Sequence, residues 1–305
     1  MSVAYKNKRL IVISGATAIG KTALSIQLAQ HFKSEIISAD SRQFYKELKI
    51  GATPPSQEEL IKVKHHFIQH LSVKDDYNVG LFEKDAIAVL YTLFKKTDTL
   101  IMAGGSGLYI DAVCNGLDTF PKVDERIKKE LIAEYKNKGI TFLQDELKKR
   151  DPVYFDIVDI NNSQRLIRAL AVIRESRKPF SSFRNKTSAK RDFKISHFSL
   201  EMEREKLYER INRRVDLMME EELLKEVENL IPYKNKNALQ TVGYKELFSY
   251  FDGEISLEEA INKIKQNTRR FAKRQISWFK REEGVQHVSC ENAFQKIIKS
   301  FPLKC

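Results

Sequence analysis

The chain has 305 residues, 42% of them hydrophobic, and a formal net charge of +12 at pH 7. This length and apolar content suit a continuous core in two domains, or in one domain with an insertion. The charge favours a polyanionic partner, either nucleic acid or a phosphate-rich ligand, with solvated lysine-rich helices as the alternative. No apolar run is long enough to cross a bilayer, and residues 1–9 lack the apolar stretch of a signal peptide.

The three cysteines, Cys114, Cys290 and Cys305, are odd in number and widely spaced. A disulfide framework or a zinc site would require closer pairs such as Cys-x-x-Cys, so we expect ordinary thiols in a reducing compartment. We therefore expect a cytoplasmic protein with no membrane partner.

Three short apolar runs each end in a polar or glycine-rich turn. Residues 10–14 lead into GATAIGKT, residues 35–39 end at Asp40, and residues 99–103 lead into GGSGLY. Strands that alternate with helical segments predict an α/β fold of the P-loop type, with a parallel sheet flanked by helices. Ligands in such sheets bind beyond the carboxyl ends of the strands, so all three turns are expected to face one cleft.

The middle of the chain differs, because residues 121–188 show charged helical patterns without a comparable β-branched run. We predict a mainly helical insertion at 119–196, which interrupts a P-loop core formed by 1–118 and 197–305. A strand-like segment at 195–200 returns the chain to the sheet. A long helix is expected over 204–230, with a buried stripe formed by Leu207, Ile211, Val215 and Met218. A C-terminal helix is expected to carry a second stripe formed by Ile261, Ile264, Phe271 and Trp278.

Residues 15–22 match the pattern G-x-x-x-x-G-K-[ST] between a predicted strand and a predicted helix. In this setting the backbone N–H groups hold phosphate oxygens, Lys21 spans two phosphates, and the Thr22 hydroxyl ligates Mg²⁺. The cradle recognises a pyrophosphate, so ATP, GTP and an isoprenoid pyrophosphate satisfy it equally. The predicted phosphate-binding residues are Gly15, Ala16, Thr17, Ala18, Ile19, Gly20, Lys21 and Thr22.

Other polar residues allow both a functional and a structural interpretation. Asp40 suits a metal ligand or a general base, and equally a helix cap. The Ser106 hydroxyl either binds substrate or satisfies a turn. Arg210 and Arg214, one helical turn apart with Arg213 beside them, suit a pyrophosphate or RNA backbone, or solvated charge.

Two further groups of polar residues are less specific. Gln164, Arg165 and Arg168 place an amide and two cations on one helical turn of the insertion, where surface salt bridges are the alternative. His65, His66 and His70 lack a nearby cysteine or acidic ligand that would complete a zinc pattern. We therefore discard a metal cluster at these histidines.

The ordered motifs resemble those of bacterial tRNA dimethylallyltransferases, also called tRNA isopentenyltransferases, over nearly the whole chain. The motifs are GATAIGKT, ISADSRQFY with IGATPP, AGGSGLY, NNSQRLIRAL, RINRRVDLM, TVGYKEL and NTRRFAKRQISWF. The resemblance implies that the P-loop binds dimethylallyl diphosphate with Mg²⁺. It also implies that the N6 amine of the adenosine 3′ of the anticodon, at tRNA position 37, attacks the allylic carbon and releases diphosphate.

The resemblance also implies roles for single residues. Asp40 is the expected general base, Ser106 contacts the reacting nucleotide, and Arg214 with Lys21 supports the leaving diphosphate. The family motifs that contact the tRNA anticodon stem-loop align with Asp40, Ser41, Arg42, Gln43, Ser106, Lys128, Gln164, Arg165, Leu166, Ile167 and Arg168. From the basic flank of the C-terminal helix, we expect Lys273 and Arg274 to bind RNA backbone.

Three rival functions use the same residues differently. A small-molecule kinase would place ATP in the P-loop and use Asp40 on a hydroxyl, but leaves the basic helices unexplained. An adenylate isopentenyltransferase would act on free nucleotide and have little use for the insertion. A non-catalytic RNA-binding module predicts no role for Asp40. We expect a monomeric enzyme that acts on tRNA.

Overall fold

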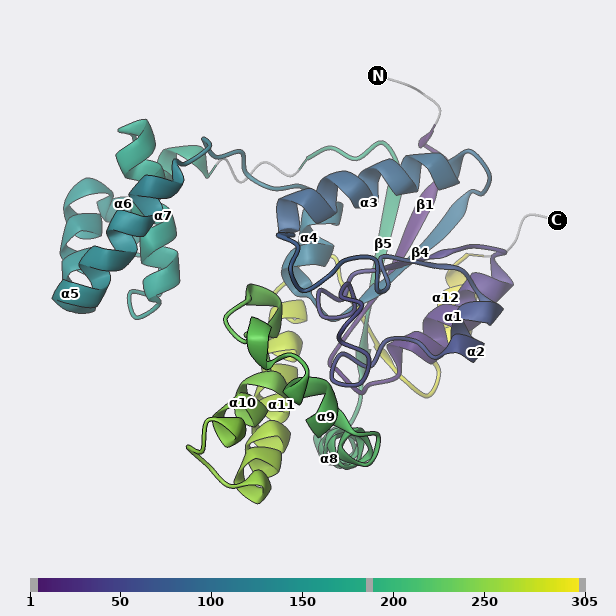
Figure 1. Cartoon of the computed structure of the whole chain (residues 1–305). Helices are drawn as coiled ribbons and strands as arrows, with labels where there is room; N and C mark the ends of the chain where they lie inside the picture. Colours follow the sequence, from purple (N-terminus) through teal and green to yellow (C-terminus); the bar gives the residue numbers. More distant parts are fainter. Residues whose placement is uncertain (1–4, 185–188, 302–305) are drawn as a thin grey trace. The chain divides into compact units, whose positions relative to one another are not determined.

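The computed structural model describes residues 5–184 and 189–301, so Cys305 lies outside the described residues. The chain forms two units (Figure 1). The core unit comprises Met1–Asn115 and Lys190–Cys305, and the inserted unit comprises Gly116–Ala189. The predicted boundary between 196 and 197 falls inside strand β5 (Lys194–Glu201), which pairs with the central strand from its first residue and so belongs entirely to the core unit.

A parallel sheet with the order β3-β2-β4-β1-β5-β6 organises the core unit, and this confirms the predicted fold class. The central strand β1 (Arg9–Ser14) lies between β4 (Thr99–Gly104) and β5. The strand β2 (Ile36–Ser38) pairs with β4. The edge strands β3 (His65–His66) and β6 (Gln286–Ser289) were not predicted, because they are short and carry polar side chains.

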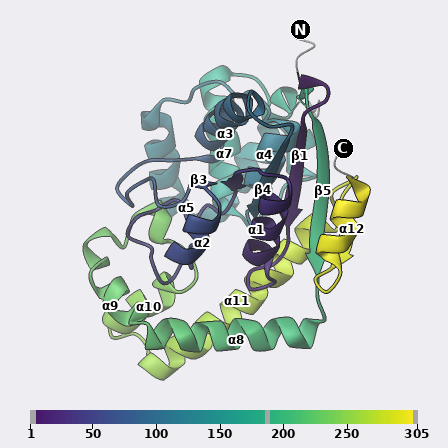
Figure 2. The same cartoon turned by 90° about the vertical axis from the view of Figure 1, so that its right-hand side faces the viewer.

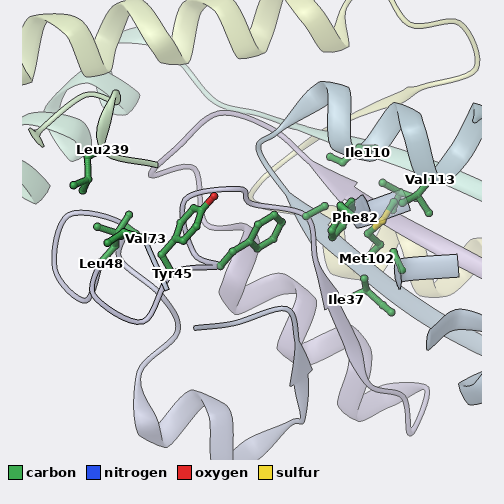
Figure 3. Packing of buried hydrophobic residues seen from close by; sticks show 14 of the residues in the cluster. Ile37, Tyr45, Leu48, Val73, Phe82, Met102, Ile110, Val113 and Leu239 are labelled. Atoms are coloured by element: carbon green, nitrogen blue, oxygen red, sulfur yellow. The ribbon is translucent and has the colours of Figure 1, made fainter. Parts of the chain in front are cut away.

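Alternation along β1 divides the core into two faces. Leu10 and Val12 pack with α3 (Val79–Phe94) and α4 (Gly107–Asn115), whereas Ile11 and Ile13 pack with α1 (Lys21–His31) and α12 (Ala293–Ser300). Figure 3 shows the first of these faces, where Phe82, Ile110, Val113 and Met102 lie together. Helices on both faces leave only the strand ends open to a ligand.

Four α-helices lie between β5 and β6 in the sequence. They are α8 (Arg204–Glu220), α9 (Leu223–Glu228), α10 (Tyr244–Phe251) and α11 (Leu257–Phe279). In Figure 2, α8 and α11 run below the carboxyl ends of β1 and β5. The single helix predicted over 204–230 is wrong, because Glu222 adopts a left-handed conformation with φ 68° that interrupts the helix. Leu207, Ile211 and Val215 of the predicted stripe are buried on α8, whereas its fourth member, Met218, is only partly buried.

The stripe predicted on α11 is only partly correct. Ile264 is buried, but the buried line continues through Ala260, Ala272, Gln275 and Phe279 rather than through the larger Phe271 and Trp278. The glycines of the loop after β4 let Gln275 of α11 approach closely, so a polar residue is buried on a line that apolar periodicity alone does not identify. Trp278 is 39% exposed.

The inserted unit is helical, as predicted, and has its own hydrophobic core. It contains α5 (Glu125–Arg150), α6 (Pro152–Phe155), α7 (Ser163–Ser176) and a 3-10 helix, η2 (Phe180–Phe183). Leu131, Leu143 and Leu147 of α5 pack against Leu166 and Leu170 of α7. Three short elements of the core unit complete the described helices: α2 (Gln57–Lys62), η3 (Ile231–Tyr233) and η4 (Asn237–Leu239).

One carboxylate on α9 fixes the loop that follows β2. Glu226 accepts hydrogen bonds from the backbone N–H groups of Lys49 (2.8 Å), Ile50 (2.7 Å) and Gly51 (3.0 Å), and from the Tyr244 hydroxyl (2.7 Å). The same tyrosine packs so closely on Gly51 that an added Cβ would lie 2.5 Å from its oxygen. The sequence IGATPP therefore needs glycine here because of the Tyr244 ring.

We predict that Glu226→Ala destabilises the protein by about 2–4 kcal/mol, because three backbone donors lose their acceptor together. Glu228→Ala, an exposed change on the same short helix, is the matched control and is expected to shift stability by less than about 0.5 kcal/mol. Urea denaturation measures both. Equal midpoints for the two variants would show that Glu226 does not anchor this loop.

Candidate active site

The turns after β1 and β2 line one cavity of about 340 Å³, whereas the turn after β4 does not line it. The expectation that all three turns face one cleft is therefore met by two of them. Ser106 of the third turn is joined to this site through its contacts with Ser41. One end of the cavity is cationic and one flank is apolar. The polar end is lined by Thr17, Ala18, Ile19, Gly20, Lys21, Thr22, Asp40, Arg42, Arg210 and Arg214. The apolar flank is lined by Ile211, Val215, Met218, Leu223, Val242, Ile264 and Phe271.

The P-loop has the backbone conformation that a phosphate cradle requires. Gly15 and Gly20 adopt φ values of 147° and 108°, and Gly20 directly precedes α1. The Lys21 ammonium donates to the carbonyl oxygens of Gly15 (3.1 Å) and Ala16 (2.7 Å). Burial lowers the pKa of Lys21 to about 8, although the nearby Asp40 carboxylate opposes this shift. The lysine is thus held in the cleft and only weakly solvated.

Two arginines of α8 reach this cavity, which favours the functional interpretation of that pair. Arg214 donates to the Thr17 hydroxyl (3.2 Å), and Arg210 lies beside Gly20. Burial, with a smaller contribution from the neighbouring Arg42 and Arg210, lowers the pKa of Arg214 to about 10, although the Asp40 carboxylate opposes this shift. Arg213 is exposed and outside the cavity lining. The cavity therefore concentrates positive charge at the P-loop.

Asp40 caps a turn, rather than the helix that the sequence left open, and also lines the cavity. One carboxylate oxygen accepts a hydrogen bond from the backbone N–H of Arg42 (3.2 Å) and so caps a turn. The residue also lines the cavity and attracts Lys21 and Arg214 electrostatically. A carboxylate in this position can accept a proton from a bound amine or hydroxyl.

The residues after Asp40 join the loops around the cavity. Ser41 contacts the Ser106 hydroxyl through its backbone N–H and its own hydroxyl, both at 3.1 Å. Arg42 donates to the carbonyl oxygens of Gly51 (2.7 Å) and Val242 (3.0 Å). Each interaction joins segments that are distant in sequence.

Gln43 extends the same set of interactions to the far side of the turn. Its amide accepts from the Ser38 hydroxyl (3.2 Å) and donates to the Thr53 carbonyl oxygen (3.0 Å). The segment predicted to contact tRNA is thus also the segment that holds the site together.

A buried amide links the P-loop to the glycine-rich loop after β4. The Gln275 side chain accepts from the Thr17 backbone N–H (2.9 Å) and donates to the Gly105 carbonyl oxygen (2.8 Å). A Cβ at Gly104 would lie 2.2 Å from the Ala39 carbonyl oxygen, and one at Gly105 would lie 2.3 Å from the Gln275 amide nitrogen. These glycines are required by close approach, which places Ser106 beside Asp40.

Several of the predicted tRNA-contact residues lie outside the cavity. Lys128, Gln164, Arg165 and Arg168 are exposed on the inserted unit. The predicted tRNA contact of the Leu166 side chain is wrong, because this side chain is fully buried in the core of that unit and cannot reach a ligand. Ile167 is partly buried against the same core.

Lys273 and Arg274 are exposed on α11, as a role in binding RNA backbone requires. Both line a second cavity of about 600 Å³, together with Trp278 and Arg281. Their contact with RNA remains a prediction.

Sequence reasoning missed several residues that shape the cleft. The sequence pattern assigns Gln275 only to an amphipathic helix. A polar residue on the buried line of α11 would have indicated a structural or functional role. Val242 and Gly243 lie in TVGYKEL and line the cavity, yet no role was assigned to that motif. Only folding brings these segments to the P-loop.

The fold and the cleft define a P-loop protein with a cationic, partly apolar ligand site. The profile of the family described as IPP transferase matches residues 43–282. A tRNA dimethylallyltransferase of Christiangramia forsetii is 54% identical over 91% of this chain and 92% of its own length. Its counterpart from Flavobacterium johnsoniae is 53% identical over 95% and 96%.

Solved structures agree with these sequences. A tRNA isopentenylpyrophosphate transferase from Bacillus halodurans is 34% identical, with a TM-score of 0.71 and coverage of 96% of this chain and 95% of that one. A eukaryotic dimethylallyltransferase acting on tRNA is 26% identical, with a TM-score of 0.79 and coverage of 98% and 81%. The chain belongs to the IPP transferase family.

We predict that pyrophosphate binding weakens as pH rises from 7 to 9, because Lys21 loses its charge near pH 8. A lowered lysine pKa means that the ammonium is present below about pH 8 and lost above it. Isothermal titration calorimetry with inorganic pyrophosphate measures the effect. Lys21→Arg stays charged throughout this range, so its affinity should not fall with pH, whatever its absolute value. If pyrophosphate affinity fell equally with pH in both proteins, deprotonation of Lys21 would not be the cause of the loss.

Proposed function

We propose that this chain transfers the dimethylallyl group of dimethylallyl diphosphate to the N6 amine of the adenosine 3′ of the anticodon in tRNA, with release of diphosphate. The observation that carries the proposal is one cavity with a P-loop, two partly buried cations and a carboxylate at one end and apolar side chains along its flank. Its relatives are named tRNA dimethylallyltransferases, and a structural neighbour is described as acting on tRNA.

The two chemical parts of the donor match the two parts of the cavity. The P-loop amides, Lys21 and Arg214 suit a diphosphate, because charge-assisted hydrogen bonds in a poorly solvated site are strong. Val215, Met218 and Phe271 suit a five-carbon allylic tail, which has no polar group to satisfy. This pairing favours an isoprenoid diphosphate over a nucleoside triphosphate.

The reaction replaces one bond to the allylic carbon with another. The adenosine nitrogen forms the new carbon–nitrogen bond while the bond from that carbon to the diphosphate oxygen breaks, and the electron pair leaves with the diphosphate. Lys21 and Arg214 stabilise the charge that develops on this oxygen. Asp40 takes the proton that the amine loses, and the Ser41–Ser106 pair fixes a hydroxyl beside it.

Magnesium fits the oxygen-bearing residues at this site. The Thr22 hydroxyl and the Asp40 carboxylate line the same cavities, and hard oxygen ligands are those that Mg²⁺ prefers. Among the described residues no group of three or more His, Cys, Asp or Glu side chains is arranged to hold a metal. The ion would therefore share ligands with the donor and water, and would neutralise diphosphate charge.

We propose tRNA as the acceptor and a monomer in the cytoplasm as the working state. The formal charge of +12 and the exposed cations of α7 and α11 support contact with an RNA backbone. In the described part of the chain, no helix combines the length and apolar composition needed to span a bilayer.

Label transfer from dimethylallyl diphosphate tests the function directly. Unmodified tRNA should become labelled, whereas free AMP should not, and ATP alone should yield no phosphorylated product. Label in AMP would replace the proposal with an adenylate isopentenyltransferase. Phosphate transfer from ATP without prenylation would replace it with a kinase.

The Asp40→Asn variant distinguishes the proposed role of Asp40 as a general base from its role as a turn cap. Asparagine keeps the oxygen that caps the Arg42 N–H, so folding should be preserved, and saturating donor offsets any change in donor affinity that comes from the lost charge. Loss of the basic carboxylate should lower kcat by about 100- to 10,000-fold. Single-turnover rates at saturating donor measure this change. A rate equal to that of the unaltered enzyme would leave Asp40 with only its structural role.

Arg214→Ala is expected to lower kcat/KM by about 100- to 1,000-fold and to weaken pyrophosphate binding, because a buried donor to the leaving group is removed. The adjacent Arg213→Ala removes the same charge from the exposed side of α8 and serves as the matched control. Steady-state kinetics with labelled donor measures both variants. Equal losses in the two would refute a local role for Arg214.

A further inference from the structure

Trp278 is the only tryptophan in the chain and is 39% exposed. Tryptophan is highly buried on average, so such exposure of a large aromatic side chain suggests a surface role. The residue follows Gln275 by three positions on α11, which places the two side chains near each other along the helix. Gln275 contacts both the P-loop and the glycine-rich loop. The exposed indole is thus close to the active site.

Two contacts fix the orientation of the indole. Its N–H donates to the Glu282 carboxylate. Gly107 packs against the ring so closely that an added Cβ would lie 2.5 Å from the indole Cδ1. Gly107 directly follows Ser106, the residue expected to contact the reacting nucleotide. The ring is therefore held beside the glycine-rich loop that follows β4, although it remains partly exposed.

Glu282 in turn belongs to a polar chain that reaches the base of the P-loop. Its carboxylate lies 3.7 Å from His197 Nδ1, and His197 Nε2 lies 2.8 Å from the hydroxyl of Ser14. Ser14 immediately precedes Gly15 of the P-loop. Burial lowers the pKa of His197 to about 4 and raises that of Glu282 to about 7. This series of polar side chains is mostly buried, and Trp278 lies at its exposed end.

The surroundings of the indole have the chemistry of a single-stranded RNA site. Trp278 lines an open cavity of about 600 Å³, where Lys273, Arg274 and Arg281 supply cations, Asp111 and Glu282 supply carboxylates, and Ser277 adds a hydroxyl. The three cations outnumber the two carboxylates. Aromatic rings stack on unpaired bases, while nearby cations contact the phosphates that join those bases. An apolar protein partner would not need three cations around one ring.

We propose that Trp278 is a stacking platform for a base of the tRNA anticodon loop, next to the nucleotide that Ser106 contacts, and that Glu282 is the positioning residue that fixes the ring. This inference rests on the proposed function, because it assumes that the acceptor is an RNA loop. The stacked base would hold the loop open while the target adenosine enters the cleft.

Tryptophan fluorescence tests the contact directly, since all tryptophan emission comes from this side chain. An unmodified anticodon stem-loop RNA, added without donor, should quench the emission in proportion to binding measured independently by anisotropy of a labelled RNA. Saturated binding with unchanged emission would overturn the proposal. Emission that changes with protein concentration alone would assign the ring to contact between copies of the chain and would also overturn it.

Kinetics tests whether the stacking matters. Trp278→Leu should raise KM for tRNA roughly 5- to 100-fold while KM for dimethylallyl diphosphate stays unchanged, and Trp278→Phe should restore KM to within a few-fold. Glu282→Ala should also raise KM for tRNA, since the indole loses its fixed orientation. Leu81→Ala, which alters a side chain of similar exposure away from this cavity, is the matched control.

Three results distinguish failure of the stacking proposal from misfolding of a variant and from failure of the proposed function. Equal KM values for the Leu and Phe variants would overturn the platform, because only one of them keeps an aromatic face. Unchanged pyrophosphate affinity verifies that a variant has folded. If the unaltered enzyme labels no tRNA at all, the proposed function fails, whereas quenching by RNA still decides whether Trp278 binds a base.

Discussion

The structure depends on keeping several cations together in a poorly solvated cleft. Lys21, Arg42, Arg210 and Arg214 surround one cavity with Asp40 as the carboxylate among them. Burial and mutual repulsion lower the pKa of both Lys21 and Arg214, so the empty cleft is electrostatically unfavourable. The diphosphate of the proposed donor would supply compensating negative charge, and its binding would stabilise the site.

Holding such a cleft open requires support from distant segments. Glu226 fixes the loop at Gly51, Arg42 joins that loop to Val242, and Gln275 joins the P-loop to Gly105. Each of these contacts replaces water as the partner of a backbone group, so the loops keep their geometry without a ligand. The helices after β5 thus act as the second wall of the site, and its geometry depends on residues 200 or more positions apart.

Local patterns and the family resemblance explain what the sequence could predict. The P-loop, the three central strands and Asp40 are each signalled by a few neighbouring residues, so they were found in the correct order. Gln275 and Trp278 were misjudged because a helical pattern ranks residues by size and polarity. Close packing instead selected Ala272 and Gln275 for burial and left the tryptophan outside. Contacts between α11 and the glycine-rich loop are visible only in three dimensions.

The same cradle can serve different chemistry because the phosphate groups play different roles. In a kinase the P-loop holds a phosphoryl group that is transferred, so the acceptor must approach the terminal phosphorus. In this protein, the apolar side chains Val215 and Phe271 would hold the carbon tail of the proposed donor next to the cationic end. The diphosphate is then positioned as the leaving group. For the proposed reaction, the apolar side chains of the cavity, rather than the P-loop, thus distinguish a diphosphate that leaves from a phosphoryl group that is transferred.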